Sequence, residues 1–90
     1  MRKSIRENVA DVLGVPKETV MDLPKLELAG NRELYLENYK NIVEYTGQLV
    51  RVRTADGFLK ITGEKLHISS MDLDGLFVQG YFRSVEFEQQ

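Results

Sequence analysis

The chain has 90 residues, a formal net charge of -2 and no cysteine. This length supports one domain with a thin core. The lack of cysteine excludes disulfides and thiolate metal sites. The slightly acidic balance argues against a dedicated nucleic-acid binder, which normally carries a basic excess. No apolar run approaches the roughly 20 residues that span a bilayer, and no export signal is recognisable, so we expect a soluble intracellular protein.

The first segment, residues 1–14, is predicted to be an amphipathic helix. Ser4 and Glu7 have the spacing of a capping box. Pro16 cannot continue the helix. One apolar stripe at helical spacing would face the rest of the domain; it consists of Ile5, Val9, Val12 and Leu13.

Beyond Pro24 the apolar pattern changes from a helical period to a period of two. Pro24 disfavours helical angles at the residue before it, so residues 15–24 are interpreted as a linker. Residues 25–90 are interpreted as β-sheet within the same single domain. An apolar–any–apolar triplet recurs there, as in strands with one buried face. The triplets begin at Leu26, Leu34, Val43, Val50, Leu59, Leu66, Leu76 and Val85.

Turn residues between the triplets predict an antiparallel meander. Two-residue turns at 47–48, 56–57 and 63–64 would place every flanking triplet on one face of the sheet. A loop at 30–32 and one at 38–41 are compatible with this, and 80–83 is either a loop or a bulge inside one long strand. The predicted opposing pairs are Leu28–Leu34, Leu36–Val43, Val43–Val52, Tyr45–Val50, Val52–Ile61 and Ile61–Leu66.

We therefore predict a mainly β fold, an antiparallel meander or roll of about seven to eight short strands with one N-terminal helix. A β-solenoid is the alternative, because its inward triplets would look similar. The uneven spacing of the triplets and the hairpin chemistry of the loops favour the meander.

No catalytic or metal-ligating constellation accompanies the strands. His67 is the only histidine and lies between two core residues, so we expect no catalytic or ligand role for it. Asp72 and Asp74 resemble a fragment of a calcium loop whose later ligands are missing, and a turn is the better interpretation. We expect neither an enzyme nor a bound cofactor or metal.

Function is therefore expected on the strand edges and on outward side chains. A meander leaves two edge strands, predicted around Leu26 and around Val85, whose unpaired backbone groups can pair with another strand. Expected partners are a second copy of the chain or another protein. A small nucleic-acid-binding β-barrel is the alternative, because outward aromatic and basic residues share a face. The predicted interaction residues are Tyr35, Phe58, Phe77, Val85 and Phe87.

Several short segments also follow one another in a distinctive order. They are DLP at 22–24, LELAGN at 26–31, LYLENY at 34–39, IVEY at 42–45, LKITGEKLHI at 59–68 and GYFRSVEF at 80–87. Together they resemble the YabP/YqfC family of sporulation proteins, and most of all its YqfC branch, from about residue 15 to residue 88.

This resemblance implies a small non-enzymatic protein of endospore formation that acts in assembly of the spore envelope, either cortex or coat. It implies a sporulation membrane protein as a partner, alongside self-association. The implied location is the cytoplasm of a sporulating cell, with a peripheral position at the forespore membrane as a further option. The resemblance carries over no catalytic residue.

Overall fold

The structure is a computed structural model and describes residues 23–89. Six strands form there: β1 (Lys25–Ala29), β2 (Glu33–Glu37), β3 (Asn41–Tyr45), β4 (Leu49–Arg53), β5 (Gly57–Met71) and β6 (Gly75–Gln89). They make one antiparallel sheet of order β1-β2-β6-β5-β4-β3, so the mainly β, antiparallel fold is confirmed. The strands of residues 23–89 are not the parallel coils of a solenoid. The helix predicted over residues 1–14 lies outside the described residues.

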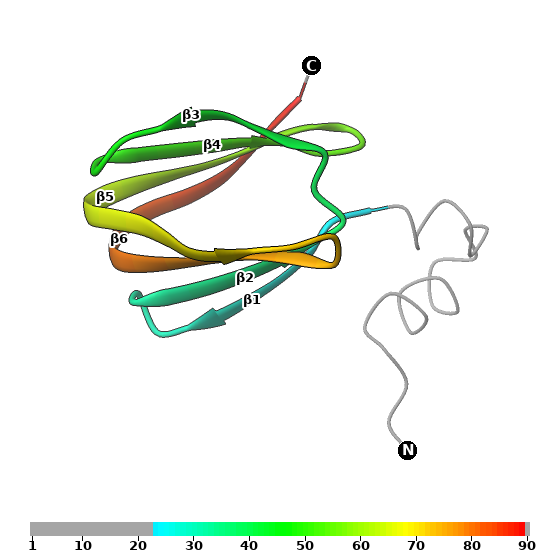
Figure 1. Cartoon of the computed structure of the whole chain (residues 1–90). Coiled ribbons are helices and arrows are strands. Elements are labelled where there is room, and N and C mark those ends of the chain that lie inside the picture. The colour runs from blue at the N-terminus through cyan, green and yellow to red at the C-terminus, as the bar shows by residue number, and fades with distance from the viewer. Residues whose placement is uncertain (1–22, 90) are drawn as a thin grey trace.

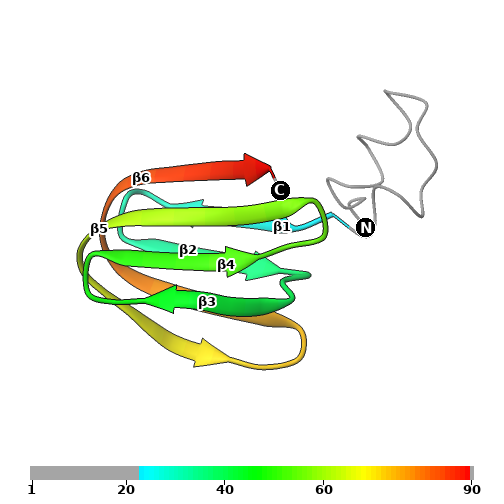
Figure 2. The same cartoon turned by 90° about the horizontal axis from the view of Figure 1, so that it is seen from above.

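The sheet folds over itself into two layers, because β5 and β6 are 15 residues long and bend together. The upper layer in Figure 1 contains β3, β4, the first half of β5 and the second half of β6. The lower layer contains β1, β2, the first half of β6 and the second half of β5. Figure 2 shows the two layers from above, with the bend at one end of the molecule.

A bulge makes the bend. Two residues of β5, Lys65 and Leu66, lie opposite the single residue Gly80 of β6, and an extra residue in one strand bends the pair. Lys65 and Gly80 both have positive φ, 53° and 150°. A Cβ atom on Gly80 would lie 2.9 Å from the Cα of Leu66, so the corner requires glycine at this position.

The strand count corrects the prediction of seven or eight short strands. The turn predicted at 63–64 is wrong, because these residues lie inside β5. Segment 80–83 is part of one long final strand, the second of the two possibilities for it. A bend inside a strand and a two-residue turn both return apolar side chains to the same face, so the triplet pattern cannot separate them.

The hairpin registers are partly as predicted. Leu28 lies opposite Leu34, and Tyr45 lies opposite Val50. The pair Ile61–Leu66 is wrong, since both residues belong to β5.

Two further pairs involving Val43 are also wrong. A bulge at Val43 places Ile42 opposite Val52 and turns the expected core residue outward. The pair Leu36–Val43 does not form, because β2 pairs with β6 whereas β3 pairs with β4.

The two-residue turn between β4 and β5 lies at 55–56 instead of the predicted 56–57. Val52 lies opposite Leu59 instead of Ile61, and the N–H of Thr54 donates to the carbonyl oxygen of Gly57 at 2.8 Å. The register is displaced by two residues. Because side chains alternate with a period of two, the triplets stay on the inner face despite the displacement.

The core lies between the two layers and draws on both. Each fully buried aliphatic side chain contributes about 1.5–3 kcal/mol relative to an exposed one, so this cluster dominates the stability of the fold. Its members are Leu34, Leu36, Val50, Val52, Leu59, Ile61, Leu66, Leu76, Val78 and Phe82.

Candidate functional site

Folding one sheet into two layers creates two seams, where an edge of one layer lies over an edge of the other (Figure 2). At the first, β3 lies over residues 67–71 of β5. At the second, residues 83–89 of β6 lie over β1. We call the first the closed seam, because side chains bridge it, and the second the open seam, because most of its length lacks such bridges among residues 23–89.

Side chains bridge the closed seam. The Ile68 N–H, on the outer edge of β5, donates to the hydroxyl oxygen of Tyr45 at 2.9 Å. The hydroxyl of Tyr39 donates to the carbonyl oxygen of Asp72 at 2.9 Å, and its ring packs against the core with Ile42. A backbone donor of an edge strand is thus given a partner by the neighbouring layer.

Among residues 23–89, backbone hydrogen bonds across the open seam lie only near the corner. The N–H groups of Gly80 and Phe82 donate to the carbonyl oxygens of Arg32 and Asn31 at 3.0 and 2.8 Å. The ladder between β2 and β6 ends at Gln79. Beyond Phe82, β5 is the one strand of residues 23–89 that pairs with β6.

The alternation of the ladder shows which β6 backbone groups point into the open seam. The Gly63 N–H donates toward β4, to the carbonyl oxygen of Gln48 at 3.1 Å. Residues 58, 60 and 62 of β5 must then face β6, where their partners are residues 88, 86 and 84. The main-chain N–H and C=O groups of Val85 and Phe87 consequently point away from β5, into the seam.

The backbone groups of β1 alternate in the same way. The carbonyl of Arg32 faces β6, so residues 33, 35 and 37 of β2 face β1, opposite residues 29, 27 and 25. The main-chain groups of Leu26 and Leu28 therefore point away from β2. Both edges of the open seam present a row of backbone donors and acceptors.

Apolar side chains line the seam. Leu26 and Val85 pack partly against the core, but Leu28 is 53% exposed and Phe87 is 66% exposed although both belong to the inner face. A cavity of about 330 Å³ runs beside Phe87 and is lined also by Leu23, Pro24 and Phe58. A second cavity, of about 180 Å³, lies between Leu28 and residues 82–85. Unpaired backbone beside exposed apolar side chains is what an added strand requires.

Comparison with known proteins places this arrangement in a family. The model of the YabP family matches residues 22–90, which include all six strands. The chain belongs to the YabP family. Its sequence is 24% identical over 75 residues to a Bacillus subtilis (strain 168) protein named "Uncharacterized protein YqfC", covering 83% of this chain and 81% of that protein. The resemblance seen in the sequence motifs is confirmed. No solved structure matches.

In this YabP-family sheet the predicted interaction residues occupy three places. Val85 and Phe87 lie in the open seam. Phe58 lines the same cavity as Phe87, but its ring is covered by two guanidinium groups. Tyr35 and Phe77 pack together, with ring centroids 5.9 Å apart, on the outer face of the lower layer. The five residues therefore do not form one continuous apolar surface. The separation of the aromatic rings also weakens the case for the stacking platform that the nucleic-acid alternative requires.

Charged groups hold the outer face of the upper layer. Arg51 and Arg53 lie over the ring of Phe58, at 4.0 and 4.8 Å from its centroid. The Nε of Arg51 lies 2.8 Å from the Oε1 of Glu88, and Glu44 lies on its other side. This network connects the end of β6 to β4. Side-chain interactions therefore cover the outer face of the upper layer, whereas its β6 edge remains at the open seam.

The outer face of the lower layer is acidic around Tyr35. Burial raises the pKa of the Tyr35 hydroxyl above its ordinary value of 10.0, and neighbouring carboxylates, Glu37 first, raise this pKa further. Within residues 23–89 no group of three His, Cys, Asp or Glu side chains could hold a metal ion. No helix in the same part of the chain is long and apolar enough to cross a membrane.

Leu28 is a seam residue that the sequence pattern missed, because its triplet assigned it to the core. The edge formed by β3 was missed as well, because a meander would place the third strand inside the sheet. No local signal marks either feature. Both depend on β6 inserting between β2 and β5, a long-range pairing.

Proposed function

We propose that this chain is a non-enzymatic interaction protein of endospore formation that acts in spore-envelope assembly. Family membership supports the link to sporulation. The outward backbone groups of Val85 and Phe87 support the interaction. The partner is a second copy of the chain or a sporulation membrane protein, and the second of these would hold the chain at the forespore membrane from the cytoplasmic side.

The proposed mechanism is strand addition at the open seam. An extended partner segment would pair with Val85 and Phe87 through main-chain hydrogen bonds, and its alternate side chains would cover Leu28 and Phe87. Covering an exposed leucine or phenylalanine contributes about 1.5–3 kcal/mol. The closed seam offers less, since Tyr45 already occupies a backbone donor of that edge.

A proline at Val85 tests the mechanism. It removes an N–H that points into the seam and leaves the N–H groups of the β5–β6 ladder in place. Light scattering of the full chain, alone and with candidate sporulation membrane proteins, should show association for the parent chain and its loss for Val85→Pro. Circular dichroism should show the same sheet in both.

The matched control is Leu73→Ser. Leu73 is a fully exposed apolar residue in the turn between β5 and β6, outside the open seam, so this change should leave association intact. Association that persists in a folded Val85→Pro chain would reject strand addition at this edge.

A further inference from the structure

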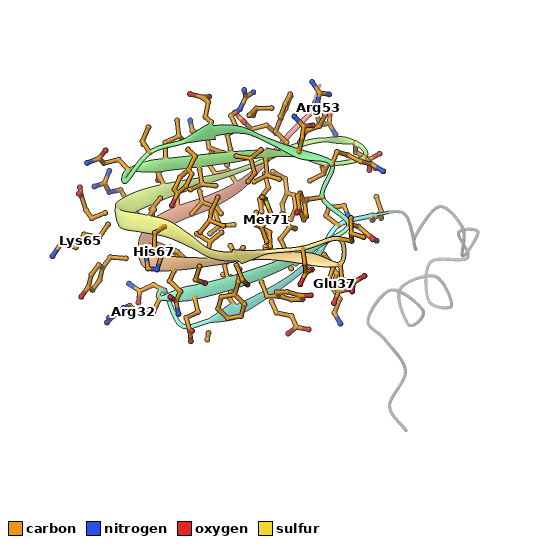
Figure 3. All side chains as sticks on the ribbon, viewed as in Figure 1. Arg32, Glu37, Arg53, Lys65, His67 and Met71 are labelled. Atoms are coloured by element: carbon orange, nitrogen blue, oxygen red, sulfur yellow. The ribbon has the colours of Figure 1, made fainter. Side chains whose placement is uncertain are left out.

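A separate hollow lies at the corner of the fold. Its volume is about 570 Å³, and it shares no lining residue with the two cavities of the open seam. Figure 3 shows Arg32, Lys65 and His67 gathered at this end of the molecule. The side chains that line it are almost all polar or charged: Arg32, Glu33, Lys65, His67, Gln79 and Tyr81.

The bulge that bends the sheet also forms this hollow. Leu66 points into the core and is 4% exposed, so its neighbour Lys65 is turned to the outside. Lys65 holds the left-handed backbone conformation, with φ of 53°, which is uncommon for a lysine. Gly80 lies opposite and lines the hollow with its backbone. The corner thus presents an ammonium group beside an unfilled depression.

A tyrosine ring holds Arg32 in place at the rim. The guanidinium carbon lies 4.2 Å from the ring centroid of Tyr81, and one NH2 group donates to the Tyr81 hydroxyl oxygen at 3.4 Å. Stacking of this kind fixes the plane of the guanidinium and leaves its remaining N–H groups available to a ligand.

Within the part of the chain that the structure describes, no ion pair neutralises the positive charge in the hollow. Among residues 23–89 the ion pairs involve Lys25, Arg51 and Arg83 and not Lys65, His67 or Arg32. The one carboxylate of the lining, Glu33, accepts a hydrogen bond from the Nε2 of Gln79 at 3.1 Å. The lining is therefore net positive on a chain whose net charge is -2.

We propose that the corner hollow binds a phosphate group carried on a larger molecule. Arg32 supplies a planar fork of donors and Lys65 a compact cation, the two groups that proteins use for phosphate. The imidazole of His67 adds a third nitrogen donor. The hollow is larger than a bare phosphate ion, so it has room for an attached organic part, either a soluble phosphate ester or a lipid head group.

The test is a titration of the isotope-labelled full-length chain, followed by NMR at constant ionic strength. The probes are inorganic phosphate, glycerol 3-phosphate, vesicles of phosphatidylglycerol and vesicles of phosphatidylcholine. Resonances of Arg32, Lys65 and His67 should shift with the phosphate-bearing probes. Tighter binding of glycerol 3-phosphate would identify a soluble ester as the source, and tighter binding of phosphatidylglycerol vesicles would identify a lipid head group.

Variants that remove charge from the hollow test whether Arg32 and Lys65 bind the phosphate. Arg32→Gln combined with Lys65→Asn should weaken binding by about tenfold or more, since each change removes a charged hydrogen-bond donor. Asparagine is chosen because it tolerates the left-handed conformation. Lys40→Gln removes a cation outside the hollow and should leave the affinity unchanged. Thermal unfolding confirms that each variant is folded.

Three results would overturn the proposal. One is the absence of shifts at the three lining residues with every probe. Another is equal affinity in the double variant and the parent chain. The last is an equal loss of affinity in Lys40→Gln, which would indicate attraction by overall charge only.

Discussion

The two seams of this fold are formed in the same way but differ in whether their backbone groups have partners. Each joins an edge of one layer to an edge of the other, and each exposes some inner-face apolar side chains. At the closed seam Tyr45 and Tyr39 reach across and satisfy backbone groups. At the open seam the backbone of Val85 and Phe87 points outward, and no strand of residues 23–89 pairs with it. The contrast shows how one sheet can protect one edge and present another.

The largest expected difference separates two phenylalanines on the inner face of β6. Phe82 is 9% exposed and Phe87 is 66% exposed. Phe82→Ala should lower the free energy of unfolding by about 3–5 kcal/mol, as in buried cores. Phe87→Ala should lower it by less than about 1 kcal/mol while weakening association. Urea denaturation measures the first quantity and light scattering the second. Equal losses of stability would show that the open seam is closed in solution.

The corner on which both seams depend is expected to be nearly as sensitive. Gly80→Ala should lower the free energy of unfolding by about 1–3 kcal/mol, because Gly80 has positive φ and its Cβ would meet Leu66. The control is Gly47→Ala, since nothing lies within 4 Å of a Cβ there. That change should alter stability by at most about 0.5 kcal/mol. Thermal unfolding compares the two, and similar melting temperatures would count against a strained corner.

A smaller effect should follow from opening the closed seam. Tyr45→Phe removes the hydroxyl that accepts the Ile68 N–H and should cost about 0.5–1.5 kcal/mol. Amide exchange at Ile68 should become faster, whereas exchange at Val78, in the buried core, should not change. Unaltered exchange at Ile68 would mean that the tyrosine does not protect this edge.

The smallest expected effect concerns pH. Because the pKa of Tyr35 is raised in the folded chain, the folded state retains the proton longer than the unfolded state. Stability should be unaffected below the ordinary value of 10.0 and should fall as pH rises above it. Tyr35→Phe should remove part of that fall, as measured by denaturation one pH unit below and above this value. An identical alkaline profile in the variant would exclude Tyr35 as a contributor.

The sequence predicted the inner face of the sheet better than its topology. Alternation alone assigned Leu34, Val50 and Ile61 to the core. The register error of two residues at the β4–β5 turn did not change which side chains were assigned to the inner face. A period of two does not determine whether a glycine marks a turn or a bend. Residues 63–64 were therefore mistaken for a hairpin loop, and β5 was interpreted as two short strands, whereas one long strand was among the two possibilities for β6.

The sequence placed one part of the candidate site, the edge at Val85, but did not predict the pairing that creates it. Val85 was predicted to lie on an edge strand, because the last strand of a meander is at the end of the sheet. The half of β6 that contains Val85 does have an unpaired side, although β6 lies between β2 and β5 in the strand order. The actual cause is that β2 covers only the first half of β6. Neither this long-range pairing nor the grouping of Arg32 with Lys65 and His67 leaves a local mark in the sequence.

Amide hydrogen exchange along the second half of β6, in the full chain at low concentration, is the most direct test of whether the backbone of Val85 and Phe87 is unpaired at the open seam. An alternating pattern is expected. Ser84, Glu86 and Glu88 should exchange slowly because they face β5, and Val85 and Phe87 should exchange fast because they face the open seam. Slow exchange at all five positions in the free chain would contradict it, since the edge would already be paired.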